Sequence, residues 1–107
     1  MIRVLIHGGG KMGCRLLAAL KDSDDFELAA LVAEPGPDGL TEDAWYPTLA
    51  ECDTVVDLLI DFTLTGGPGE AASWCAAHHV PLLSGTTALS DTDKAALQSA
   101  AGLVPVM

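Results

Sequence analysis

Short apolar runs that alternate with polar or amphipathic stretches constrain the fold of this chain most strongly. The runs are about as long as single strands, and nearly every residue in them is apolar, which suits strands covered on both faces of a parallel sheet. Between the first two runs, Met12, Leu16, Leu17 and Leu20 fall on one face of a helix. Strand and helix in alternation predict right-handed βαβ units, so we expect an α/β fold with a doubly wound parallel sheet.

The expected elements follow from these runs and from turn residues. We expect strands at Arg3–Ile6, Phe26–Ala33, Leu58–Phe62, Val80–Leu83 and Leu103–Met107, and a short one near Trp45–Tyr46. We expect helices at Met12–Leu20, from Leu49, at Glu70–His78 and from an N-cap at Ser90 to Ala101. Asp93 completes a capping box with Ser90, and Gly102 suits the C′ position. The last run is apolar to its end, so we expect a single domain over residues 1–107, cut off before a further domain and open to self-association.

Composition excludes several classes of function. Fifteen acidic residues against five basic ones give a formal charge of −10, which disfavours nucleic-acid and membrane-surface partners. No apolar run approaches the length of a membrane span, and the first residues do not resemble a signal peptide. Three cysteines cannot all pair, and none lies in a CxxC spacing, so we expect a cytoplasmic protein. Any bound phosphate must then be held by local groups.

A glycine-rich loop supplies such groups. Gly8, Gly10 and Gly13 form a G-x-G-x-x-G pattern directly after the first strand and at the start of the first helix. In dinucleotide-binding domains the first glycine permits a tight turn, the second lets the backbone approach a pyrophosphate, and the third brings helix and strand together. The helix N-terminus then offers free N–H groups to the phosphates. This pattern predicts a Rossmann-type domain.

An acidic residue follows the second strand at the place of the adenosine ribose. Glu34 lies 21 residues beyond Gly13, where a carboxylate would accept hydrogen bonds from both ribose hydroxyls. The alternative is a solvated glutamate at the start of a turn, and we favour the ribose. Pro35 leaves no adjacent basic side chain for a 2′-phosphate, which favours NADH. Lys11 keeps NADPH open, because it either meets a phosphate or is an ordinary solvated charge.

Three motifs in the chain together resemble the dihydrodipicolinate reductase family. They are the opening run from Ile2 to Leu17, IRVLIHGGGKMGCRLL; the Asp61-Phe62-Thr63 triplet; and Ser84-Gly85-Thr86-Thr87. They occur in the family's order and span essentially the whole chain. The chain departs from the family in a glycine loop one residue shorter than in many members, and in Thr65 and Ala88, where proline and glycine are common.

The resemblance implies an NAD(P)H-dependent reductase of lysine and diaminopimelate biosynthesis that delivers a hydride to a cyclic dicarboxylate. It implies these cofactor contacts: Gly8, Lys11, Met12 and Gly13 at the pyrophosphate, Glu34 at the ribose, Phe62 and Thr63 on the nicotinamide side, and Gly85 and Thr87 at the carboxamide and the substrate edge. All of them fall at carboxyl ends of expected strands, where ligands bind in open parallel sheets. Apart from the resemblance, Thr86-Thr87 reads as ordinary turn chemistry.

The family's substrate domain, with a His-His pair and a nearby lysine, does not occur in these residues. His78-His79 ends an expected helix with no lysine within two turns, so we interpret the pair as a helix C-terminal cap. His7 is expected to pack beside the glycine turn, although contact with the cofactor is the alternative. We therefore assign no catalytic residue and no metal ligand, and we expect the isolated chain to bind cofactor without reductase turnover.

Two rival functions stay open. One is a non-catalytic nucleotide-sensing or interaction module that uses the same glycine loop for binding only. The length of the genomic reading frame would distinguish it from part of a longer enzyme. The other is a different dehydrogenase, because homoserine and aspartate dehydrogenases open with similar glycine loops. The Asp61-Phe62-Thr63 and Gly85-Thr86-Thr87 motifs argue against that alternative by resemblance.

Overall fold

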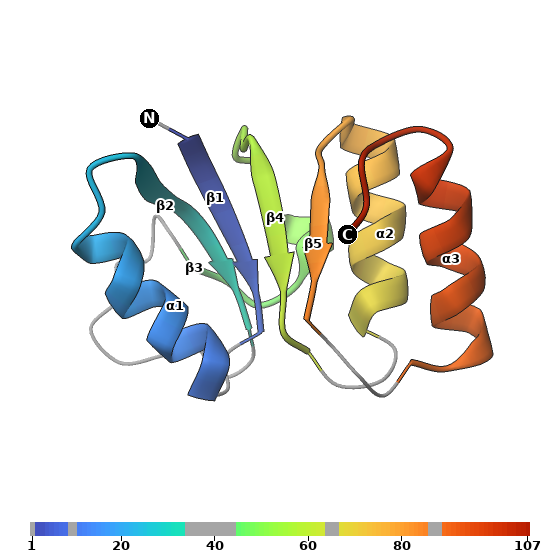
Figure 1. Ribbon diagram of the computed structural model, residues 1–107, viewed down its shortest axis with the longest axis horizontal. Helices are drawn as coiled ribbons and strands as arrows, with labels where there is room; N and C mark the ends of the chain where they lie inside the picture. The colour runs from blue at the N-terminus through green and yellow to red at the C-terminus, as the bar shows by residue number, and fades with distance from the viewer. Residues whose placement is uncertain (1, 9–10, 34–44, 64–66, 86–88) are drawn as a thin grey trace.

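The computed structural model is a five-stranded, all-parallel sheet with helices on both faces (Figure 1). It describes residues 2–8, 11–33, 45–63, 67–85 and 89–107, with the backbone alone for residues 11–14. The elements in chain order are β1 (Ile2–His7), α1 (Lys11–Lys21), β2 (Phe26–Val32), β3 (Trp45–Tyr46), the 3₁₀ turn η1 (Leu49–Glu51), β4 (Leu58–Asp61), α2 (Gly67–His78), β5 (Leu82–Ser84) and α3 (Asp91–Ala101). The predicted α/β class is confirmed.

The order of strands places β1 at the centre of the sheet. The order is β3-β2-β1-β4-β5, so the chain runs from β1 outward to β3 and then returns to β4 on the other side of β1. Each neighbouring pair is parallel, and His7 at the end of β1 is in register with Val32 and with Asp61. The carboxyl ends of β1 and β4 therefore form the switch point of the topology, where open α/β sheets bind ligands.

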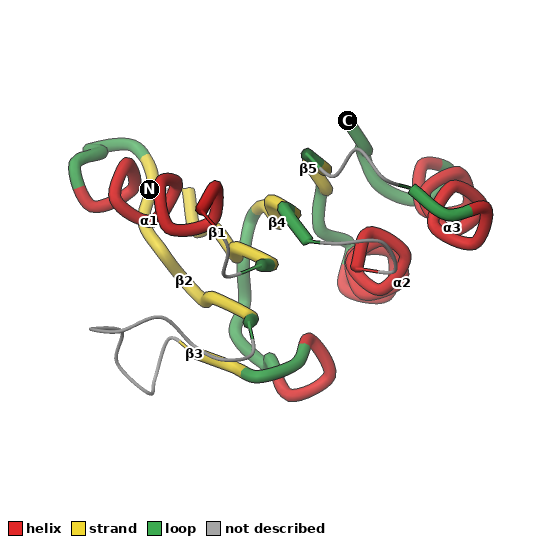
Figure 2. Tube along the Cα trace, turned by 90° about the horizontal axis from the view of Figure 1, so that it is seen from below, coloured by secondary structure: helices red, strands yellow, loops and turns green. Residues whose placement is uncertain are grey.

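Alternate residues of the strands supply two separate cores. Leu5, Leu59 and Leu82 face α2, whereas Ile6 and Ile60 face the side covered by α1, as the period of two in a strand requires. Figure 2 shows the two helices on opposite sides of the strands. Burial on both faces accounts for the nearly continuous apolar runs of the sequence.

Helix α2 begins earlier than the sequence predicts. It starts at Gly67 rather than Glu70, with Pro68 in its first turn, where the missing N–H of proline breaks no hydrogen bond. The helix packs between the sheet and α3, and its buried side chains include Ala71, Ala72 and Cys75. A helix enclosed on two sides carries no single apolar stripe, so periodicity marks its start poorly.

The capping prediction for α3 is confirmed at its start, and the helix ends at Ala101 as predicted, but Gly102 is a right-handed C-cap instead of a C′ residue. The Ser90 hydroxyl accepts from the Asp93 N–H at 3.0 Å, and the Asp93 carboxylate accepts from the Ser90 N–H at 3.1 Å. Gly102 has right-handed helical angles (φ −76°, ψ −12°), so it does not act as a left-handed C′ glycine. The left-handed position that ends a helix is instead His79, with φ 58° after α2.

The two apolar runs near the C-terminus form less strand than predicted. Strand β5 starts at Leu82 because the Val80 N–H donates to the Cys75 carbonyl at the end of α2, and Pro81 has no N–H. The final run forms one parallel bridge, between Leu82 and Val106, instead of a full strand. It still lies beside β5, on the side away from β4.

Candidate dinucleotide-binding site

The turn after β1 is shaped by Gly8. Its φ of 122° is unfavourable for any residue with a side chain, and a Cβ there would lie 2.6 Å from the carbonyl oxygen of Phe62. Its N–H donates to the Val32 carbonyl at 2.9 Å, which holds the turn against β2. Helix α1 then begins at Lys11. The main chain of Phe62, just after β4, thus requires glycine at the first position of the motif, whether or not a ligand is bound.

The start of α1 provides a donor set that suits phosphate. The first four N–H groups of a helix have no partner within it, and the helix dipole adds a partial positive charge at this end. The first turns of α2 and α3 lie at the same edge, because both helices run antiparallel to the strands they follow (Figure 1). In a chain with a formal charge of −10, such local donors are the groups that can hold an anion.

Phe62, Gly8 and Gly85 meet where β1, β4 and β5 end. The Phe62 N–H donates to the His7 carbonyl at 2.9 Å, and the Gly85 N–H donates to the Asp61 carbonyl at 2.7 Å. A Cβ at Gly85 would lie 2.0 Å from Cε1 of Phe62, so the ring rests directly against the glycine. Phe62 and the main chain after β5 therefore approach each other closely only because residue 85 is glycine.

A buried polar cluster lies beneath these loops, and sequence reasoning missed it. Asp61 has no solvent exposure, and its Oδ1 lies 3.0 Å from Nδ1 of His7. The Thr63 hydroxyl donates to the same oxygen at 2.8 Å, and the Ser84 hydroxyl donates to Oδ2 at 3.3 Å. We call these four residues the Asp61 cluster. The available signal was register: His7 and Asp61 end neighbouring parallel strands, which puts their side chains on one face.

The structure brings together four of the ten predicted site residues and leaves six only partly described or undescribed. Gly8, Phe62, Thr63 and Gly85 all lie at the carboxyl edge. Lys11, Met12 and Gly13 lie in the first turn of α1, where only the backbone is described. Gly10, Glu34 and Thr87 lie outside the described residues. His7 packs beside the glycine turn as expected, through the contact with Asp61.

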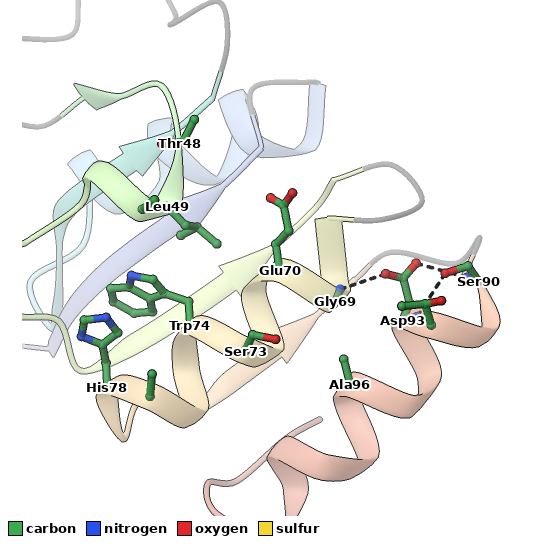
Figure 3. Close-up of a pocket in the computed structure, with 13 residues that line it drawn as sticks. Thr48, Leu49, Gly69, Glu70, Ser73, Trp74, His78, Ser90, Asp93 and Ala96 are labelled. Atoms are coloured by element: carbon green, nitrogen blue, oxygen red, sulfur yellow. Dashed lines mark hydrogen bonds between the residues drawn. The ribbon is translucent and has the colours of Figure 1, made fainter.

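A separate groove runs along the outer side of α2 (Figure 3). Its volume is about 720 Å³, and its walls come from η1, α2 and the start of α3. The His78 ring stacks on Trp74 with centroids 4.2 Å apart, and Asp93 joins α3 to α2 by accepting from the Gly69 N–H at 2.9 Å. Helix α2 ends at His78, in agreement with the predicted place of the histidine pair at a helix C-terminus.

The two described cysteines are buried, free thiols. Burial, with a smaller contribution from the nearby Asp61 carboxylate, raises the pKa of Cys75 to about 12. Burial also raises the pKa of Cys52. A protonated thiol is a poor nucleophile and a poor metal ligand, so both residues act as packing groups.

Neither metal binding nor membrane insertion has support in the described part of the chain. Its histidine, cysteine and acidic side chains form no group of three or more that could hold a metal ion. Within the same residues, none of the helices has both the length and the apolar character needed to cross a bilayer.

The fold and the glycine turn together define a Rossmann-type nucleotide-binding domain. The family described as "Dihydrodipicolinate reductase, N-terminus" matches residues 2–107, and the chain belongs to that family. A 4-hydroxy-tetrahydrodipicolinate reductase of Xylella fastidiosa (strain 9a5c) is 35% identical over 111 residues, which cover 99% of this chain and 46% of the relative. One from Campylobacter curvus is 37% identical over 113 residues, covering 100% of this chain and 43% of the relative.

Solved structures are similar in fold. The dipicolinate-bound dihydrodipicolinate reductase from Paenisporosarcina sp. TG-14 superposes with a TM-score of 0.75 at 26% identity, over 96% of this chain and 43% of that one. A homoserine dehydrogenase of S. aureus, at 11% identity and a TM-score of 0.62, shares the fold over 98% of this chain and 31% of its own. The chain thus spans less than half the length of the relatives that it matches.

Proposed function

We propose that this chain binds NADH or NADPH across the carboxyl ends of β1, β4 and β5. The observation that carries this proposal is the meeting of Gly8, Phe62 and Gly85 at the switch point of the sheet, where neither glycine leaves room for a side chain. Close main-chain approach at this place is what an extended dinucleotide needs. Membership of a nicotinamide-dependent reductase family supports the same conclusion.

Each part of the cofactor has proposed partners. The pyrophosphate would lie on the turn and the first helical N–H groups, and the adenosine ribose would lie at the carboxylate after β2. The nicotinamide would lie over the loops after β4 and β5. The full set is Gly8, Gly10, Lys11, Met12, Gly13, Glu34, Phe62, Thr63, Gly85 and Thr87.

The bound cofactor would supply a hydride, and this chain would orient it. The Phe62 ring, fixed against Gly85, offers a flat apolar surface that excludes water beside the nicotinamide. The N–H groups at the start of α1 would hold the phosphates, so that the two ends of the cofactor are anchored independently. Orientation of this kind is the contribution that a cofactor-binding domain makes to hydride transfer.

In the complete reductase we propose that the acceptor is a cyclic dicarboxylate of lysine and diaminopimelate biosynthesis. The relatives carry the name 4-hydroxy-tetrahydrodipicolinate reductase, and one solved relative is bound to dipicolinate. We assign none of these residues to holding the dicarboxylate or to donating a proton. We therefore expect these 107 residues alone to bind cofactor and to show no measurable reductase turnover.

We place the protein in the cytoplasm and favour NADH over NADPH. Two of its three thiols are buried and free, which suits a reducing compartment. Glu34 is followed by proline, and a carboxylate without a basic neighbour repels a 2′-phosphate.

Calorimetric titration with NADH and with NADPH tests this function. We expect NADH to bind more tightly, and we expect Glu34→Ala to weaken NADH binding about tenfold, because a charged hydrogen bond to the ribose is lost. Asp24→Ala is the matched control: it removes one negative charge from an exposed residue at the opposite edge of the sheet. A folded chain that binds neither dinucleotide would refute the proposal. Equal effects of the two substitutions would refute the role of Glu34.

A further inference from the structure

The Asp61 cluster connects three strand ends through side chains. The Asp61 carboxylate, at the end of β4, meets His7 from β1 and Ser84 from β5, and the Thr63 hydroxyl from its own loop. Asp61 is fully buried, and the His7 side chain is 8% exposed. An ionised carboxylate only accepts hydrogen bonds, so in that form of the pair Nδ1 of His7 is the donor.

The same residues also connect these strand ends through the main chain. The His7 carbonyl accepts from Phe62, and the Asp61 carbonyl accepts from Gly85. The His7–Asp61 pair is therefore linked to the segments that carry Phe62 and Gly85 both by side-chain and by main-chain hydrogen bonds. Any shift of one loop relative to another must stretch a bond to a buried carboxylate, which is costly where water cannot replace it.

The cluster lies on the α2 face of the sheet rather than on the α1 face. Thr63 is packed against the first residue of α2, since a Cβ at Gly67 would lie 1.8 Å from its hydroxyl oxygen. Cys75 of α2 lies near enough for the Asp61 charge to raise the pKa of its thiol, and that thiol stays neutral. The pyrophosphate donors belong to α1. The cluster thus supports one end of the proposed cofactor site and not the other.

We infer that His7 and Asp61 are positioning residues that fix the Phe62 and Gly85 loops for the nicotinamide half of the cofactor. This inference rests on the proposed dinucleotide-binding function. It predicts a selective effect: loss of the pair weakens contacts with the nicotinamide and leaves contacts with the adenosine diphosphate portion in place. If the pair had a purely structural role, its loss would weaken the binding of both portions of the cofactor together.

The test compares NADH with ADP-ribose, which lacks the nicotinamide, by calorimetry on the full chain. In Asp61→Asn we expect the Kd for NADH to rise about tenfold, equivalent to about 1.4 kcal/mol, while the Kd for ADP-ribose changes less than about twofold. His7→Leu should act in the same way, and His7→Gln should retain more NADH affinity because an amide N–H can still donate to Asp61. Leu20→Ala, a buried change at the far end of α1, controls for general destabilisation.

Ser84→Ala keeps the inference testable if the buried substitutions unfold the chain. It removes one donor from a half-buried hydroxyl, and we expect about a threefold rise in the Kd for NADH with no change for ADP-ribose. The inference would be overturned if these variants weakened the binding of NADH and ADP-ribose equally, or changed the Kd of neither. Failure of the unmodified chain to bind either ligand would instead refute the proposed function.

Discussion

On the β1–β2 side of the sheet, main chain shapes the carboxyl edge. Gly8 turns the backbone with a φ of 122°, its N–H is bonded to Val32, and α1 starts directly afterwards. On the β4–β5 side, buried side chains shape the edge, and a carboxylate with no solvent exposure sits at their centre. The glycine turn can be recognised in the sequence from the spacing of its glycines. The buried cluster cannot, because its side chains come together only when the strands pair.

The largest expected change in stability is at Gly8, where the turn after β1 contacts the main chain after β4. Gly8→Ala should lower the free energy of unfolding by about 3 kcal/mol, because an unfavourable φ is combined with a clash against main chain. Urea denaturation measures this change. Gly85→Ala is the informative comparison: its added methyl meets a side chain, the Phe62 ring, instead of main chain, so a smaller loss is expected. A loss at Gly8 no greater than that at Gly85 would mean that the Phe62 carbonyl moves freely.

The next largest loss of stability is expected on the β4–β5 side of the sheet, where Asp93 bonds both helices. Asp93→Ala should cost about 2 kcal/mol, because the carboxylate accepts from the first turn of α2 and from the N-cap of α3. Ser90→Ala loses one capping bond and should cost about 1 kcal/mol. Thermal or urea unfolding distinguishes the two. Equal losses would show that the bond to Gly69 adds nothing to stability.

A smaller effect depends on pH and on the thiol beside the Asp61 cluster. The pKa of Cys75 is raised to about 12 in the folded chain, so the unfolded chain loses this proton first as pH rises. Stability from the protonated thiol is complete below the ordinary pKa of 9.0 and falls by about 1.4 kcal/mol per pH unit above it. Urea denaturation at pH 8 and pH 10 should show this fall in the unmodified chain and a weaker one in Cys75→Ala. Identical pH slopes in both would contradict it.

The smallest effect is expected at a glycine that the sequence misassigns. Gly102→Ala should change stability by less than about 0.5 kcal/mol or raise it slightly, because φ is −76° and the nearest atom to a new Cβ is 3.6 Å away. The same unfolding measurement serves as a control for Gly8→Ala. A loss above about 1 kcal/mol would restore the left-handed assignment.

Most of the fold could be predicted because its signals are local. Apolar runs located the strands, and Ser90 with Asp93 located the start of α3 to the residue. The start of α2 could not be predicted, since a helix packed against both the sheet and α3 carries no single apolar stripe to mark its register. The left-handed residue after α2 is His79, a residue type that carries no such signal.

The glycines of the candidate site could be predicted from the sequence, whereas the buried Asp61 cluster beneath them could not. Gly8 and Gly85 are named by their motifs, and the structure gives each of them a steric reason. The role of Asp61 follows from its contact with His7, and the two residues are 54 positions apart in the sequence. A histidine at that distance looks like an isolated side chain until the register of β1 and β4 is known.

The carboxylate of Asp93 has a mechanical consequence for the molecule. By bonding the first turn of α2 and the N-cap of α3 at once, it adds a polar link between two helices that both contribute apolar side chains to the same buried core. We therefore expect fraying at this end of either helix to weaken the same end of the other, so that the two helix starts open locally as one unit.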